Sequence, residues 1–203
     1  QTLLYVPLDG LCFLMVAFGL FMSTMHLGKP KRFYRGFNNL RHSPVSREGL
    51  GIAIFMATLG LHILFSLPAN GLVQTLFAAL FGSEISSLIS PASSVSLATV
   101  FGALAVPASL IGLYYMNRCY RIKARPFWNH WQVGTAFFGS MLSLGTLIAA
   151  LVMIPTLALL GESYQVVLQV SALVLTLGLA VEAVGHWAHA KAMGSAEHEG
   201  GAA

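Results

Sequence analysis

The stretch HLGKPKRFYRGFNNLRHSPVSREGLGIAIFMATLGLHILFSL, residues 26–67, places six of the chain's eleven Lys and Arg residues directly before a long apolar run. Another apolar run, residues 10–27, ends where this stretch begins. A charged turn between two such runs is typical of a hairpin that joins two transmembrane helices. We call residues 29–47, which hold the six cations, the basic loop.

The composition indicates that lipid surrounds most of the chain. Of its 203 residues, 56% are hydrophobic and only 9% are charged, whereas a soluble domain has about 25% charged residues. The two cysteines, Cys12 and Cys119, are far apart, and no CxxC or Cys/His ligand spacing occurs. We therefore expect neither an iron–sulfur cluster nor structural zinc in this chain.

Apolar runs long enough to cross a bilayer occur five times. A spanning helix needs roughly 20 apolar residues, and the runs cover residues 10–27, 49–67, 96–116, 134–160 and 166–187. Residues 72–81 are too few to cross and are expected to form a loop helix at the interface. The sequence predicts an all-α integral membrane helical bundle, with residues 1–203 as a single transmembrane domain and a disordered tail from about residue 194.

The cations lie on one side when these spans alternate across the membrane. The basic loop shares that side with Arg118, Arg121, Lys123, Arg125 and Lys191, while the opposite loops carry Glu84 and Glu162. The positive-inside rule places the cationic side in the cytoplasm and predicts a multi-pass protein of the bacterial inner membrane. Alternatively, the charges serve to dock a partner protein.

Two ionisable residues flank the basic loop. His26 ends the first span, where an ionisable group is a functional candidate, and its ring can both donate and accept hydrogen bonds, as a quinone or quinol requires. Glu48 precedes the second span, where a carboxylate favours the helix N-terminus and Ser46 is the expected cap. Glu48 could instead accept a proton beside His26.

Other histidines leave two alternatives open. Glu182, His186 and His189 lie on one face of the last span. A pair formed by His62 with His186 or His26 could ligate haem and make the chain a di-haem membrane cytochrome subunit. Ionisable residues within the spans, such as Glu182 and His62, would also suit a transporter-like membrane module. Aromatic residues among the cations are expected to meet lipid headgroups or a protein, and not nucleic acid.

Two motifs resemble one known family. The first is His26-Leu27-Gly28-Lys29-Pro30-Lys31-Arg32, followed by Asn38-Asn39-Leu40-Arg41 and by Ser43-Pro44-Val45-Ser46-Arg47-Glu48. It resembles the HLG-x-P-x-R, NLR-x-S-x-x-SRE pattern of the membrane-anchor subunits of dimethyl-sulfoxide reductase. The second, Arg125-Pro126-Phe127-Trp128-Asn129 with Phe137-Phe138 and Leu144-Gly145, resembles the RP-x-W-N, FF and LG stretch of the same family.

The resemblance implies a subunit that anchors an oxidoreductase complex. Its partners would be a four-cluster ferredoxin-like iron–sulfur subunit and a molybdopterin catalytic subunit. The anchor would bind menaquinone or ubiquinone, carry no haem or metal, and pass electrons between the quinone pool and the clusters in anaerobic respiration. The substrate chemistry would occur in the catalytic subunit, on a small sulfur compound, by sulfite oxidation or by sulfoxide or polysulfide reduction.

The resemblance also implies roles for particular residues. The quinone site would contain His26, Arg32, Glu48 and Trp128. Docking of the iron–sulfur subunit would use Lys29, Lys31, Arg35, Arg41, Arg47, Arg121 and Arg125. Members of the family resemble proteins with more spans and with one helix before the HLG helix, so we expect an upstream helix to be missing here. The cytoplasmic cations suit the anchor of a membrane-bound sulfite-oxidising complex.

Overall fold

The computed structural model describes residues 2–81, 91–121 and 128–200, and all the regular structure in these ranges is helical. Five helices are long and apolar enough to cross a membrane, namely Tyr5–Met25, Pro44–Ala69, Ala92–Tyr120, Gln132–Leu159 and Gln165–Ser195. The predicted all-α bundle with five spans is therefore confirmed. The chain divides into two compact units, Gln1–Gly112 and Leu113–Ala203.

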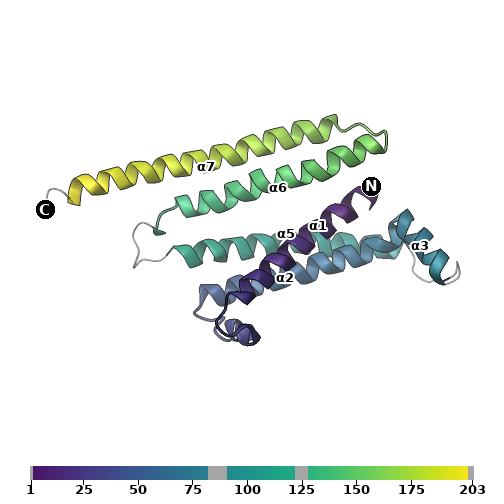
Figure 1. Cartoon of the computed structure of the whole chain (residues 1–203), viewed down its shortest axis with the longest axis horizontal. Coiled ribbons are helices and arrows are strands. Elements are labelled where there is room, and N and C mark those ends of the chain that lie inside the picture. The colour runs from purple at the N-terminus through teal and green to yellow at the C-terminus, as the bar shows by residue number, and fades with distance from the viewer. Residues whose placement is uncertain (1, 82–90, 122–127, 201–203) are drawn as a thin grey trace. The chain divides into compact units, whose positions relative to one another are not determined.

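The elements follow one another along the chain as Figure 1 shows. They are α1 (Thr2–Met25), the 3-10 helix η1 (Pro30–Phe37), α2 (Pro44–Ser66), the 3-10 helix η2 (Leu67–Ala69), α3 (Gly71–Phe81), α5 (Pro91–Tyr120), α6 (Gln132–Leu159) and α7 (Gln165–Gly200). The loop helix expected at residues 72–81 is present as α3. Helix α7 extends to Gly200, past residue 194, where we expected disorder to begin. The grouping of residues 1–203 into one domain stays a prediction.

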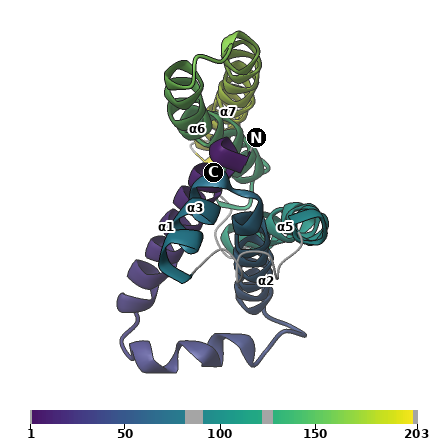
Figure 2. The ribbon, with the colours of Figure 1, turned by 90° about the vertical axis from the view of Figure 1, so that its right-hand side faces the viewer.

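The first unit begins with a helical hairpin. Helices α1 and α2 are joined through η1, which lies across the end of the hairpin in Figure 2. Ser43 caps α2, because its Oγ accepts a hydrogen bond from the backbone N–H of Ser46 at 3.3 Å, and Pro44 occupies the first helical position. The expectation that Ser46 is the cap was wrong: Ser46 lies inside the first turn and is buried.

Helix α2 packs closely on the first part of α5. A Cβ atom added to Gly51 would lie 2.8 Å from the Cα atom of Gly112, so the two backbones approach each other directly. Near the other end of α2, the rings of Phe65 and Phe101 stack with their centroids 5.6 Å apart. Small residues that allow such an approach are typical of helix contacts in membranes, where lipid competes for every apolar surface.

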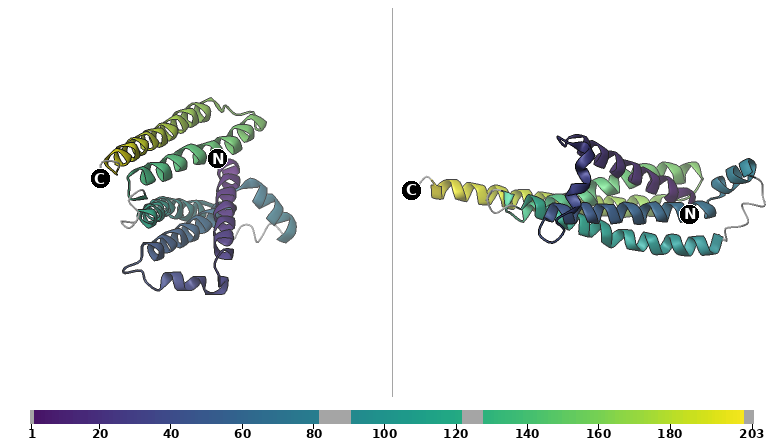
Figure 3. Two further views of the ribbon diagram at one scale, coloured as in Figure 1. Left: turned by 60° about the vertical axis from the view of Figure 1, so that its left-hand side comes forward. Right: turned by 90° about the horizontal axis from the view of Figure 1, so that it is seen from below.

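The second unit contains the antiparallel pair α6 and α7, which runs side by side in Figure 1 and in the left view of Figure 3. The turn between them uses Gly161, whose positive φ of 71° is a conformation that a residue with a side chain rarely adopts. Along the pair, a Cβ atom on Gly178 would lie 2.7 Å from the backbone N of Ser143, and one on Gly139 would lie 2.9 Å from the carbonyl O of Gly178. The two helices therefore touch through glycines.

A side chain at this contact should separate the helices. We expect Gly178→Ile to destabilise the folded chain by about 1–3 kcal/mol, the usual penalty for overpacking, and to lower its midpoint of thermal unfolding in detergent. Gly145→Ile is the matched control, because Gly145 is also in a spanning helix but has nothing within 4 Å of its Cβ position. Equal midpoints for the two variants would contradict the glycine contact.

Candidate functional site

His26 lies just after the end of α1 and presents one ring nitrogen to its surroundings. Its Nδ1 is 2.7 Å from the carbonyl O of Met22. A carbonyl oxygen only accepts hydrogen bonds, so the ring proton is on Nδ1 and the lone pair is on Nε2. The side chain is exposed, and within the described part of the chain Nε2 has no hydrogen-bond partner. Nε2 can therefore accept a hydrogen bond from a hydroxyl group or, once protonated, donate one to a carbonyl.

The basic loop folds back onto the start of α2. Residues 30–37 form η1, and the ring of Phe37 lies 3.4 Å from the Cβ position of Gly49 on α2. Five of the predicted docking and quinone-site cations are exposed on this loop, namely Lys29, Lys31, Arg32, Arg35 and Arg41. The loop is thus an ordered turn with its positive charge directed outwards.

Arg47 is engaged within the chain. Its Nε donates to the carbonyl O of Leu40 at 2.8 Å, and its Nη2 donates to the carbonyl O of Arg41 at 2.5 Å. The guanidinium group thereby fixes the last part of the basic loop to the first turn of α2. This role inside the loop was not expected from the sequence, which assigned Arg47 to partner docking.

The structure brings three of the four predicted quinone-site residues to the same end of the first unit. His26 follows α1, Arg32 is on η1 and Glu48 is in the first turns of α2, where it is half-buried. His26 bonds to its own helix and makes no hydrogen bond to Arg32 or Glu48. Trp128, the fourth residue, belongs to the second unit and is 45% exposed there.

Of the remaining predicted docking residues, Arg121 is exposed just beyond α5, and its backbone N–H donates to the carbonyl O of Asn117 at 3.2 Å. Arg125 lies outside the described residues.

A row of polar residues lines the contact between α6 and α7. Ser143 Oγ donates to Glu182 Oε1 at 3.1 Å, and the side-chain nitrogen of Gln132 is 3.2 Å from Nδ1 of His186. One turn further, the ring of His189 lies 5.1 Å from that of His130. These pairs show that the predicted polar face of the last span turns toward α6, as is usual for polar residues in a helix bundle.

His130 lies outside the spans, before α6. Partial burial lowers the pKa of His130, and the positive charges of His189 and Arg121 lower it further. Its neutral form is therefore favoured, with Nδ1 accepting from the backbone N–H of Gln132 at 3.1 Å. Within the described ranges, no group of three or more His, Cys, Asp or Glu side chains could hold a metal ion.

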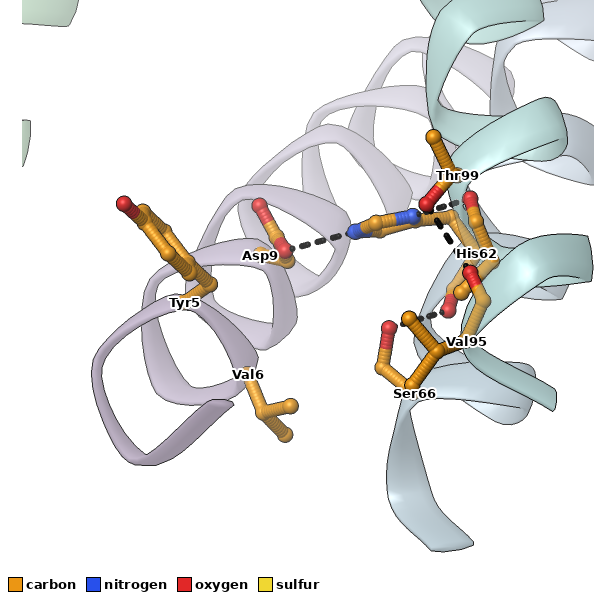
Figure 4. Close-up of a pocket in the computed structure, with 8 residues that line it drawn as sticks. Tyr5, Val6, Asp9, His62, Ser66, Val95 and Thr99 are labelled. Carbon is orange, nitrogen blue, oxygen red and sulfur yellow. Dashed lines mark hydrogen bonds and ion pairs between the residues drawn. The ribbon is translucent and has the colours of Figure 1, made fainter. Parts of the chain in front are cut away.

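A polar pair inside the first unit was not expected from the sequence. Asp9 on α1 and His62 on α2 approach to 3.1 Å between Oδ2 and Nε2, and Nδ1 of His62 lies 2.7 Å from the carbonyl O of Ala98 on α5. Figure 4 shows the pair beside a cavity of about 380 Å³. Its lining residues are Tyr5, Val6, Asp9, His62, Ser66, Val95, Ala98 and Thr99.

The hydrogen bonds of His62 also limit its ability to ligate haem. Both ring nitrogens of His62 already have partners, Asp9 and Ala98, so His62 could ligate haem only by losing one of them. Asp9 was overlooked because the first span was expected to start at residue 10, whereas α1 starts at Thr2 and includes Asp9. Asp9 directly precedes the apolar run at residues 10–27. If the first helix had been expected to start before residue 10, Asp9 would have been recognised as an ionisable residue within a span.

Comparison with known proteins identifies the family. The family model for the DMSO reductase anchor subunit (DmsC) matches residues 8–197, nearly the whole chain. No curated protein and no solved structure matches the chain. The match includes both motifs that carried the resemblance and all five spanning helices from residue 8 onward. The chain is therefore a multi-pass membrane protein that belongs to the DMSO reductase anchor subunit family, whose members anchor a molybdoenzyme complex in the membrane.

Proposed function

We propose that this chain is the quinone-reactive anchor of a molybdopterin iron–sulfur oxidoreductase acting on a small sulfur compound. It exchanges electrons between menaquinone or ubiquinone in the membrane and an iron–sulfur subunit, and the sulfur chemistry takes place in the catalytic subunit. The observation that carries this proposal is the free Nε2 of His26 at the end of a membrane span, next to a loop of exposed cations.

His26 handles the proton in this proposal. Oxidation of a quinol to a quinone releases two electrons and two protons, and the electrons leave for the clusters of the partner subunit. The Nε2 lone pair accepts one proton from a quinol hydroxyl, while the bond from Nδ1 to Met22 fixes the tautomer and the ring plane. In the reverse direction, protonated His26 donates to the quinone carbonyl.

Two neighbours complete the quinone site. Glu48, in the first turns of α2, provides a second proton acceptor at the same membrane surface. The exposed guanidinium of Arg32 makes the local potential positive, which favours release of a proton from the bound quinol.

The exposed cations provide the docking surface for the iron–sulfur subunit. Complementary charge speeds the encounter of two proteins and fixes their relative orientation. Docking at this end brings the clusters to the membrane surface at which His26 lies. The proposed surface comprises Lys29, Lys31, Arg35 and Arg41 of the basic loop. By the positive-inside rule it faces the cytoplasm of a bacterium.

Replacement of His26 tests the quinone site. We expect His26→Ala to lower quinol-dependent turnover of the complex by about 100-fold or more, because a positioned acid or base contributes a factor of that size. Turnover with a soluble dye that feeds the partner subunits directly should stay normal, and the complex should stay assembled.

His42→Ala is the control for that experiment, because His42 is an exposed histidine of the same loop, 16 residues further along the chain than His26. Quinol-dependent turnover should be normal in His42→Ala. If His26→Ala kept the wild-type rate of quinol-dependent turnover, the assignment of His26 to the quinone site would be contradicted.

Charge reversal tests the docking surface. We expect Lys31→Glu combined with Arg35→Glu to release the iron–sulfur and catalytic subunits from the anchor during purification in mild detergent. Wild type should release them only at higher salt, because salt screens the attraction between exposed charges. Lys191→Glu, which changes an exposed lysine on α7, serves as the control. Full retention of both subunits by the double variant at every salt concentration would contradict docking at the basic loop.

Labelling tests the orientation. A single cysteine placed at position 36 of the basic loop, in a Cys12→Ser, Cys119→Ser background, should react with a membrane-impermeant thiol reagent only after the cells are opened. Reaction in intact spheroplasts would place the loop on the outer face.

A further inference from the structure

We propose that the Asp9–His62 pair and its cavity form a proton-exchange site within the membrane, open toward the face at which α1 begins and α2 ends. This inference stands apart from the quinone proposal. His26 follows Asp9 by 17 residues along the same helical path, a distance of roughly 25 Å at 1.5 Å per residue. The two groups therefore lie near opposite ends of the hairpin and do not share a ligand.

The hydrogen bonds of His62 show that the pair shares one proton. Nδ1 of His62 lies 2.7 Å from the carbonyl O of Ala98, which can only accept, so Nδ1 carries a hydrogen. Nε2 lies 3.1 Å from Oδ2 of Asp9. A bare lone pair facing a bare carboxylate at this distance would be repulsive, so a proton lies between them. The pair is then either a carboxylic acid with a neutral imidazole or a carboxylate with an imidazolium, and it is neutral overall in both forms.

Neutrality explains how the pair is tolerated inside a membrane span. An isolated charge in the hydrocarbon is costly, so ionisable groups there pair with each other and often mark a route for protons. His62 lies four residues before the end of α2 at Ser66, a distance of roughly 6 Å along the helix. The pair is therefore shallow enough for water to reach it from one face.

The cavity gives water that access. Its volume of about 380 Å³ has room for several water molecules, each of which takes about 30 Å³ in the liquid. Figure 4 shows the Asp9 and His62 side chains at the cavity wall, where they are 26% and 23% exposed. A proton bound between them can therefore exchange with water through the second carboxylate oxygen of Asp9, Oδ1.

The hydroxyl groups in the wall suit water as the occupant. Ser66 donates to the carbonyl O of His62 at 2.7 Å, and Thr99 donates to the carbonyl O of Val95 at 2.9 Å. Each hydroxyl hydrogen is donated to a backbone carbonyl oxygen. The oxygen lone pairs of Ser66 and Thr99 therefore remain to accept hydrogen bonds from molecules in the cavity. Water can donate to those lone pairs and to the carboxylate at the same time.

Few other charges act on the pair. On α1 the titratable neighbours are Tyr5, which lines the cavity, and the half-buried thiol of Cys12. The parts of α2 and α5 that pack here, residues 49–66 and 91–112, contain no titratable side chain except His62 itself. Because these described segments of α1, α2 and α5 contain no Lys or Arg that could hold Asp9 as a permanent anion, the protons bound to the pair determine its charge.

The carboxyl group of Glu182 provides a contrast within the same protein. It accepts from Ser143 at 3.1 Å and lies between the glycines at which α6 and α7 touch, where a Cβ on Gly139 would have no room. A carboxyl group in such close packing serves helix association. Glu182→Gln is therefore a matched control for a substitution of Asp9.

Infrared spectroscopy of the full chain, purified with its co-purifying subunits, tests the proposal. Aspartate labelled with ¹³C at the side-chain carboxyl marks the carbonyl stretch of protonated Asp9. We expect a wild-type band that changes with pH and is lost in Asp9→Asn. The asparagine amide can still donate to Nε2 of His62, so Asp9→Asn should keep the fold and the subunits. His62→Gln should shift the pH midpoint of the band, and Glu182→Gln should leave it unchanged.

Reconstitution into liposomes tests the direction of access. When the pH is changed on one side only, the Asp9 band should follow the compartment at which α1 begins. A band that does not respond to pH, or that no Asp9 variant removes, would show that the pair is only a link between helices and would overturn the proposal. A band that follows the other compartment would also overturn it.

Discussion

A polar side chain in these helices needs a partner within the protein, because the surrounding lipid offers none. Only five hydrophobic residues are buried in the described part of the chain, namely Leu59, Ala98, Ala105, Ala108 and Leu157. A large apolar core therefore does not hold the bundle together. Close glycine contacts and a few polar pairs do so, as membrane helices require. His62 shows this most clearly, since its ring joins α1, α2 and α5.

The need of polar groups for partners in lipid also explains why the two ends of the first unit differ in their charged residues. At one end the chain leaves the lipid through His26 and the basic loop, where cations can be exposed without penalty and Arg47 ties the loop to α2. At the other end Asp9 and His62 remain within the span and are tolerated as a neutral pair. The family assignment bears on the first end, because an anchor subunit needs a surface for its partner subunits, and we propose that the basic loop is this surface.

Much of this architecture follows from the sequence. The five spans follow from the lengths of the apolar runs, and the end of the first span at His26 follows from the HLG turn. The motif around His26 and Glu48 also indicated the family that the comparison confirmed. These features depend on neighbours in the chain, which is why reading along the sequence finds them.

Features that depend on distant residues were not predictable. Asp9 and His62 are 53 positions apart, and no spacing rule connects them. The cap at Ser43 was assigned to Ser46 because both are serines near the same helix start, and only the backbone path distinguishes them. Arg47 looked like its exposed neighbours, although its side chain folds back onto the carbonyl groups of residues 40 and 41. Trp128 lies in the other unit, so its place in the quinone site stays a prediction.

We propose above all that a membrane quinone meets the iron–sulfur subunit at the end of α1. An electron cryomicroscopy map of the complex purified in lipid nanodiscs with added quinone tests it most directly. We expect density for the quinone head group within hydrogen-bonding distance of Nε2 of His26, and a cluster-bearing subunit covering the basic loop. A map in which the loop contacts only solvent or lipid head groups, with the quinone elsewhere, would contradict it.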